Sequence, residues 1–166
     1  MLLATMSCIR VMVSVRFQQL YRGVNDGYYT LVPISHKHPI QITFPLVQET
    51  RLRSVLSSKE AKALIDKYPA ISLNTFHVHN NSLEEAHFRQ AIREGSCEDT
   101  MSIAKTFRAR ITHACGQNKR PPVSHERIFK MASMRSLYEL AVALNTSTDD
   151  IQAKFSSRFG ILLGEV

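Results

Sequence analysis

The sequence contains no tryptophan, three cysteines, and only six residues each of glycine and proline. The cysteines (Cys8, Cys97 and Cys115) are odd in number and widely spaced, which argues against a disulfide framework and favours a reducing cytosol. So little glycine and proline excludes a collagen-like or low-complexity chain. No apolar run approaches the roughly 20 residues that span a bilayer. We therefore expect a globular, cytoplasmic protein without a transmembrane segment.

Positive charge is the feature that the composition has in excess. The 166 residues include 21 Lys and Arg against 14 Asp and Glu, a net charge of +7, and 44% are hydrophobic, enough for a buried core. The charge is concentrated between Met101 and Arg135, where eight basic residues accompany one acidic residue, Glu126. Such a block is either a solvated helix surface or a binding surface for a polyanion, most often nucleic acid.

The first third of the chain has the pattern of β-strands. Apolar and polar residues alternate in residues 9–17 and 40–46, and residues 28–34 are rich in aromatic and β-branched side chains. Residues 51–56 suggest a short fourth strand. The Gly, Asn and Asp residues of 23–27 predict a turn. These strands predict a small antiparallel sheet or partial barrel over residues 1–56.

The pattern changes to helices after residue 57. Ser57 to Glu60, Ser82 to Glu85 and Ser147 to Asp150 have the spacing of helix-capping boxes. Apolar stripes predict further helices from about Asp99 to Ala114 and from Ser124 to Leu144. We divide the chain into a β module (1–56), a helix and linker (57–81) and a helical domain (82–166). The expected fold class is α+β.

No residue pattern predicts catalysis. The chain has no glycine-rich phosphate loop, no Gly-x-Ser-x-Gly turn and no Cys-x-x-Cys pair. The pairs His36/His38 and His77/His79 lack third and fourth ligands at zinc-like spacing. Glu84 and Glu85 suit the start of a helix better than acid–base chemistry. We therefore expect neither an enzyme nor a metal or other cofactor.

The basic block predicts a DNA-binding surface. Its members lie one turn apart on two predicted helices or in the loop between them, so that they can face one surface. Basic residues without interleaved exposed aromatics favour phosphate contacts and strong salt dependence over base stacking. The predicted DNA-binding residues are Lys105, Arg108, Lys119, Arg120, Arg127 and Lys130. A protein-interaction adaptor, whose basic helices meet an acidic protein surface, is the alternative.

Several segments together resemble the CarD-like family of bacterial transcription regulators, most closely its short Gram-positive members. In the first half they are Tyr28 to Ile34, Ile40 to Pro45 and Arg51 to Ala61. In the second half they are Glu98 to Ile103, Ser124 to Arg127 and Leu137 to Leu144. The resemblance covers about residues 8–159 and implies a Tudor-like β-barrel before the helical domain.

The resemblance also implies partners. The β module would bind the β subunit of RNA polymerase through an exposed strand, with Ile40, Ile42, Thr43, Phe44 and Arg53 as its contacts. The helical domain would bind double-stranded promoter DNA at the upstream edge of the bubble, so the protein would be nucleoid-associated. Some members wedge a tryptophan into the minor groove, whereas this chain has none and carries Glu84 near the aligned position.

Overall fold

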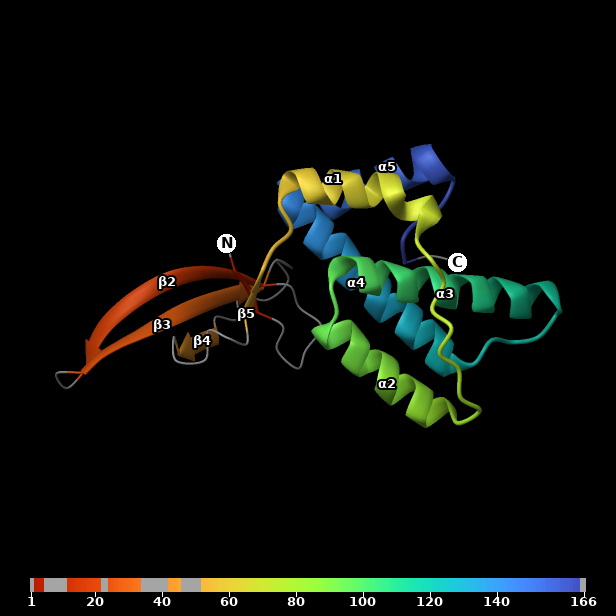
Figure 1. Cartoon of the computed structure of the whole chain (residues 1–166), viewed down its shortest axis with the longest axis horizontal. Coiled ribbons are helices and arrows are strands. Elements are labelled where there is room, and N and C mark those ends of the chain that lie inside the picture. The colour runs from red at the N-terminus through yellow and green to blue at the C-terminus, as the bar shows by residue number, and fades with distance from the viewer. Residues whose placement is uncertain (1, 5–11, 22–23, 34–41, 46–51, 165–166) are drawn as a thin grey trace. The chain divides into compact units, whose positions relative to one another are not determined.

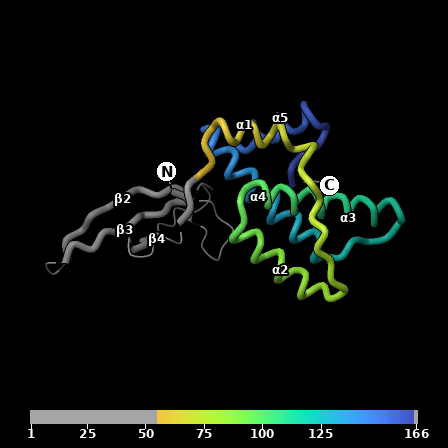
Figure 2. Tube along the Cα trace, in the orientation of Figure 1, coloured from red at the N-terminus to blue at the C-terminus, as the bar shows by residue number. Residues whose placement is uncertain are grey.

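The computed structural model describes residues 2–4, 12–21, 24–33, 42–45 and 52–164, with side chains from Val55 to Gly164 (Figure 1). The chain divides into two compact units, Met1–Val55 and Leu56–Val166. Figure 2 shows the second unit as the coloured part of the trace. The segment 57–81, expected as a separate helix and linker, is therefore part of the same compact unit as the later helices.

The first unit contains five strands. They are β1 (Leu2–Ala4), β2 (Met12–Tyr21), β3 (Val24–Pro33), β4 (Ile42–Pro45) and β5 (Leu52–Ser54). All pairings are antiparallel, and the order in the sheet is β4-β3-β2-β1-β5. The β2–β3 pair is in register from Met12 opposite Pro33 to Tyr21 opposite Val24. Asp26 and Gly27 are thus paired within β3, and the turn predicted over 23–27 is wrong at these positions.

The predicted fold class is wrong. The regular elements of residues 55–164 are all helices, without a strand, so no Tudor-like β domain is seen in these residues. The strands follow each other in a sheet with β4 and β5 at its two ends. Period-two alternation predicts that a segment is extended, but it does not predict how the strands of a sheet are closed, which explains the error.

Five α-helices make up the second unit. They are α1 (Ser58–Lys67), α2 (Asn81–Glu94), α3 (Cys97–Gly116), α4 (Val123–Leu144) and α5 (Thr148–Phe159), and a short 3₁₀ helix, η2 (Tyr68–Ala70), follows α1. Capping boxes start α1 at Ser57 and α5 at Ser147, as predicted. The cap of α2 differs, because Asn80 Oδ1 accepts from the N–H groups of Ser82 and Leu83. Asn is as good a cap as Ser, and it comes two residues earlier.

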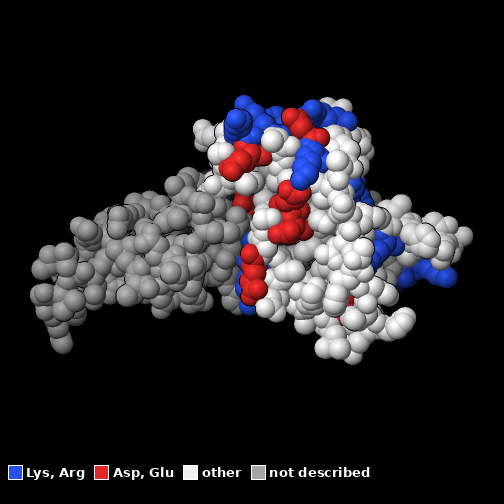
Figure 3. Space-filling view, viewed as in Figure 1, with Lys and Arg blue, Asp and Glu red and all other residues white. Residues whose placement is uncertain are grey.

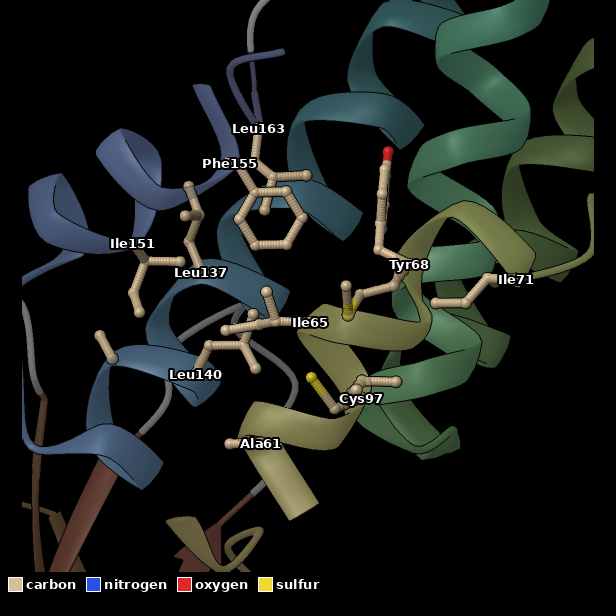
Figure 4. Close-up of a cluster of buried hydrophobic side chains, with 13 residues drawn as sticks. Ala61, Ile65, Tyr68, Ile71, Cys97, Leu137, Leu140, Ile151, Phe155 and Leu163 are labelled. Atoms are coloured by element: carbon tan, nitrogen blue, oxygen red, sulfur yellow. The ribbon is translucent and has the colours of Figure 1, made fainter. Parts of the chain in front are cut away.

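Two groups of buried side chains hold the helices together. The first joins α1, the start of α3, the second half of α4 and α5, and Figure 4 shows Ile65, Leu140 and Phe155 converging within it. The second joins α2, α3 and the first half of α4 around Phe88, Phe107 and Ile128. The rings of Phe88 and Phe107 meet edge to face with centroids 4.8 Å apart. The helices α3 and α4 contribute to both groups and form the centre of the unit.

Residues 71–80 cross this unit in an extended conformation and are fixed by side chains of α3. Ser102 Oγ donates to the carbonyl of Ser72 (2.7 Å), and Thr106 Oγ1 accepts from the N–H of Asn74 (2.7 Å). Arg110 Nη2 donates to the carbonyl of Phe76 (2.7 Å). Residues 102, 106 and 110 are four apart and share one helix face. That face of α3 therefore supplies the partners that a neighbouring strand would otherwise provide.

No helix in the part of the chain that the structure describes is long and apolar enough to cross a membrane.

Candidate nucleic-acid interface

Some residues of the basic block bind backbone carbonyls of the helical unit, and the others face solvent. Lys105 belongs to the first kind, because its Nζ donates to the carbonyls of Tyr68 (3.2 Å), Pro69 (2.8 Å) and Ile71 (2.7 Å). Its ammonium group thereby satisfies the carbonyls at the end of η2 and lies 5.5 Å from the centre of the Tyr68 ring. All three donors of Lys105 have protein partners in this arrangement.

Three arginines of the block also bind backbone carbonyls. Arg108, predicted as a DNA contact, donates to the carbonyl of Leu162 and lies against the ring of Phe129. Arg135 is buried and donates to the carbonyl of Gly95 (2.9 Å). Arg110 donates to Phe76 and pairs with Glu84 (2.9 Å). Half of the eight basic residues therefore hold the helical unit together, so their charge is only in part available to a partner.

The other four basic residues are exposed: Lys119, Arg120, Arg127 and Lys130. None forms an ion pair with another residue that the structure describes. Lys119 Nζ donates only to the side-chain amide of Gln117 (3.1 Å), and Glu126 is the one acidic residue within the same stretch. The predicted cluster of six thus reduces to four free cations in the α3–α4 loop and the first turns of α4.

The loop that carries Lys119 and Arg120 is held in one conformation. At the end of α3, Asn118 has a left-handed backbone (φ 55°). The N–H of Asn118 donates to the carbonyl of Cys115 and that of Lys119 to the carbonyl of Ala114, each at 2.9 Å, which is the Schellman pattern. Pro121 and Pro122 then lead into α4, whose first turn has no side-chain cap. The basic loop is therefore fixed before any partner binds.

In the view of Figure 3, the surface near the end of α3 is mostly basic. In Figure 3, blue Lys and Arg atoms occur there without red neighbours, whereas blue and red alternate over α1 and α5. Ion pairs account for part of that alternation, since Lys67 pairs with Glu98 (2.6 Å) and Arg158 with Asp66. Opposite charges cancel over α1 and α5, so the end of the unit near the α3–α4 loop is the better site for an anion.

The residues predicted to contact RNA polymerase lie in two separate strands. Ile42, Thr43 and Phe44 are in β4, and Thr43 stands opposite Thr30 of β3. Arg53 is in β5, opposite Leu3 of β1. The strand order separates β4 from β5 by three strands, so the described pairing does not bring these residues together. Ile40 lies outside the described residues.

A buried charge cluster that the sequence did not reveal lies in the same helical unit. Glu84 of α2 is 1% exposed, and three groups surround its carboxylate, each from a different segment. Oε1 is bound by Arg110 Nη1 of α3 (2.9 Å) and His77 Nδ1 of the 71–80 segment (3.0 Å), and Oε2 by His125 Nε2 of α4 (3.2 Å). We call these four residues the Glu84 cluster. Because Glu84 points inward, it cannot act as a groove-wedging side chain.

Burial and hydrogen bonding act in opposite directions on the Glu84 cluster. Burial alone raises the pKa of Glu84, but hydrogen bonds from His77, Arg110 and His125 together outweigh it and hold the pKa below its usual value of 4.5. Burial lowers the pKa of His125 below 6.5, and the neighbouring Glu84 carboxylate offsets this only in part. Near neutral pH, Glu84 is thus ionised and His125 is uncharged.

The cluster has the geometry of a structural charge site. No group of three or more His, Cys, Asp or Glu residues suited to a metal ion exists among the described residues. Within the cluster, the guanidinium of Arg110 supplies the positive charge that a metal would bring. The two imidazoles donate to the carboxylate, since an ionised carboxylate can only accept. The sequence signal for this site was weak, because its residues lie up to 48 positions apart, from His77 to His125.

The comparisons with known proteins add no assignment. Neither a protein-family model nor a curated protein matches the chain.

Lys105 can be tested as a structural residue. We expect Lys105→Gln to lower the free energy of unfolding by about 2 kcal/mol. The reason is that three backbone carbonyls lose the charged donor from which they accept hydrogen bonds. Lys130→Gln removes the same charge from an exposed position on α4 and should change stability by less than about 0.5 kcal/mol. Urea unfolding of both variants measures the difference. Equal stability of the two would show that the three carbonyl contacts contribute nothing.

Glu84 has a matched control in the next residue. We expect Glu84→Gln to destabilise the protein by about 3 kcal/mol, because Arg110 is left without its counter-charge in a largely desolvated site. Glu85→Gln breaks only the surface pair with Arg89 (2.6 Å) and should cost about 0.5 kcal/mol or less. Thermal or urea unfolding at pH 7 compares the two variants. A Glu84→Gln protein as stable as the Glu85→Gln protein would contradict the role of the buried pair.

Proposed function

We propose that the helical unit binds double-stranded DNA without catalysis, through phosphate contacts made by Lys119, Arg120, Arg127 and Lys130. The observation that carries the proposal is that these four side chains are exposed and free of ion pairs in the described structure. The other four cations of the block have backbone or carboxylate partners. The proposed surface is therefore smaller than the charge of the sequence alone suggested.

The arrangement of the loop supports phosphate binding. A cation held on a fixed backbone loses less conformational freedom on binding than one on a mobile loop. The N-terminal end of α4 follows directly and lacks a side-chain cap, so its dipole adds partial positive charge where Lys119 and Arg120 lie in the sequence. Phe129, the one aromatic ring between these cations in the sequence, is buried, which favours contacts to the backbone over stacking on bases.

We further propose that this DNA-binding unit belongs to a bacterial, nucleoid-associated transcription regulator whose second partner is the RNA polymerase β subunit. The resemblance to CarD-like regulators supports this class. The position of β4 at one end of the strand order supports a contact through that strand, because an edge strand offers backbone groups for pairing with another chain. Arg53 lies at the other end of the order and is not part of this proposed contact.

DNA binding is tested with two variants of equal charge. Lys119→Gln/Arg120→Gln removes two cations from the proposed surface, and Lys59→Gln/Lys62→Gln removes two exposed cations from α1. We expect the first variant to lower duplex affinity and to reduce the slope of log affinity against log salt by about 2, since each phosphate contact contributes about 0.9. The α1 variant should retain the slope of the parent.

Fluorescence anisotropy with a labelled duplex, measured over a series of salt concentrations, gives both quantities. Identical slopes for the parent and the loop variant would contradict the assigned surface. A parent protein that binds no duplex at low salt but retains an acidic protein partner would favour the interaction adaptor instead.

The polymerase contact has its own measurement. We expect the polymerase β subunit to co-purify with the full chain from a bacterial lysate, and to remain bound after nuclease digestion, because the contact is made between proteins. Mass spectrometry identifies the retained subunits. Loss of the polymerase after nuclease treatment would show that DNA alone connects the two.

A further inference from the structure

The Glu84 cluster joins four segments of the helical unit at one point. Glu84 comes from α2, Arg110 from α3, His125 from α4 and His77 from the extended segment 71–80. The ring of Phe107 contacts two members of the cluster. Its centre lies 5.1 Å from the centre of the His125 ring and 4.9 Å from Cζ of Arg110. The proposed DNA contacts do not include any of these residues, so the cluster calls for a separate explanation.

The charges of Glu84 and Arg110 balance each other, and protonation of His125 would disturb that balance. Glu84 carries one negative charge and Arg110 one positive charge, and each neutral imidazole can donate one hydrogen bond without adding charge. His125 faces Arg110 and His77 as well as Glu84, and its side chain is 12% exposed. A proton on His125 would place a second positive charge beside a single buried carboxylate. Water has little access to screen that charge in the closed structure.

Few contacts besides the hydrogen bond from His125 to Glu84 hold the first turn of α4 in place. Its N-cap is Pro122, which makes no side-chain cap, and Val123 in the first turn is 49% exposed. His125 is the residue of this turn that reaches a partner on another helix, through its bond to Glu84. On the opposite side of the cluster, residues 76 and 77 are fixed by the bonds from Arg110 to Phe76 and from His77 to Glu84. Both segments therefore depend on the same carboxylate.

We propose that the Glu84 cluster is a proton-sensitive latch, which holds the first turn of α4 and residues 76–79 against α2 and α3 at neutral pH and releases them when His125 is protonated. Release hydrates the imidazolium and separates it from Arg110. The titratable or charged groups that face the carboxylate are His77, Arg110 and His125, one from each packed segment. His79 lies next to His77, with ring centroids 5.6 Å apart.

The lowered pKa values of His125 and Glu84 set the direction of the pH dependence. Because the pKa of His125 is lowered from 6.5 in the closed structure, the open state binds the proton more tightly. The latch is therefore most stable above pH 6.5 and weakens as the pH falls from 6.5 toward the lower pKa of the closed state. The pKa of Glu84 is lowered from 4.5, so its carboxylate stays ionised in that range and its own loss of stabilisation comes at lower pH.

Hydrogen exchange of the full chain tests the latch without any DNA. After correction for intrinsic exchange rates, we expect the hydrogen-bonded amides of Phe76, His125 and Glu126 to exchange faster at pH 5.5 than at pH 7.5, by up to about tenfold, which corresponds to at most about 1.4 kcal/mol in opening free energy. Amides of α5 should keep their protection, which separates local release from global unfolding. Unchanged protection of the two segments would overturn the proposal.

Two glutamine variants identify the responsible group. His125→Gln can still donate to Glu84 but cannot be protonated, so its exchange in the two segments should not depend on pH after the same correction. His113→Gln replaces an exposed histidine near the end of α3 and should behave as the parent does. Acceleration of equal size in His125→Gln and the parent would overturn the assignment to His125. If His125→Gln does not fold, the imidazole titration of His125 by NMR in the parent must coincide with the exchange transition, and a mismatch would overturn it.

Discussion

A carboxylate removed from water must be surrounded by donors, and in this chain that requirement decides where four segments of the helical unit meet. Glu84 is buried at the start of α2, and its oxygens bind donors from α3, α4 and the extended segment. Apolar packing alone tolerates small shifts of a helix along its neighbour. Hydrogen bonds to one carboxylate do not, so the cluster fixes the register in which these segments pack.

The role of α3 explains why the basic block overstates the positive charge that is exposed on the surface. Two faces of α3 are apolar: Met101 packs into the first buried group, and Ile103 and Phe107 pack into the second. A third face, between these two, uses polar and basic side chains to bind the backbone of an extended segment that lacks a partner strand. Lysine and arginine suit this task because they are long and carry several donors. A local excess of positive charge can therefore be a sign of unpaired carbonyls inside the protein.

The sequence predicted features that depend on neighbouring residues and missed those that depend on distant ones. The capping boxes of α1 and α5 were predicted because cap and partner are three residues apart. The start of α2 was displaced because Asn80 competes with Ser82 for the same task. The barrel was wrong because alternation does not specify how strands close. The Glu84 cluster was not predicted because its members meet only after α2, α3 and α4 pack.

The left-handed residue at the end of α3 has a consequence for encounter rates. Asn118 and the two hydrogen bonds around it fix the direction in which the chain leaves the helix. Hydrogen bonds thus fix the backbone of Lys119 before any encounter. Association then requires no slow rearrangement of the backbone, only rotation of the side chains on the nanosecond scale or faster. For the duplex partner proposed above, this arrangement favours rapid association.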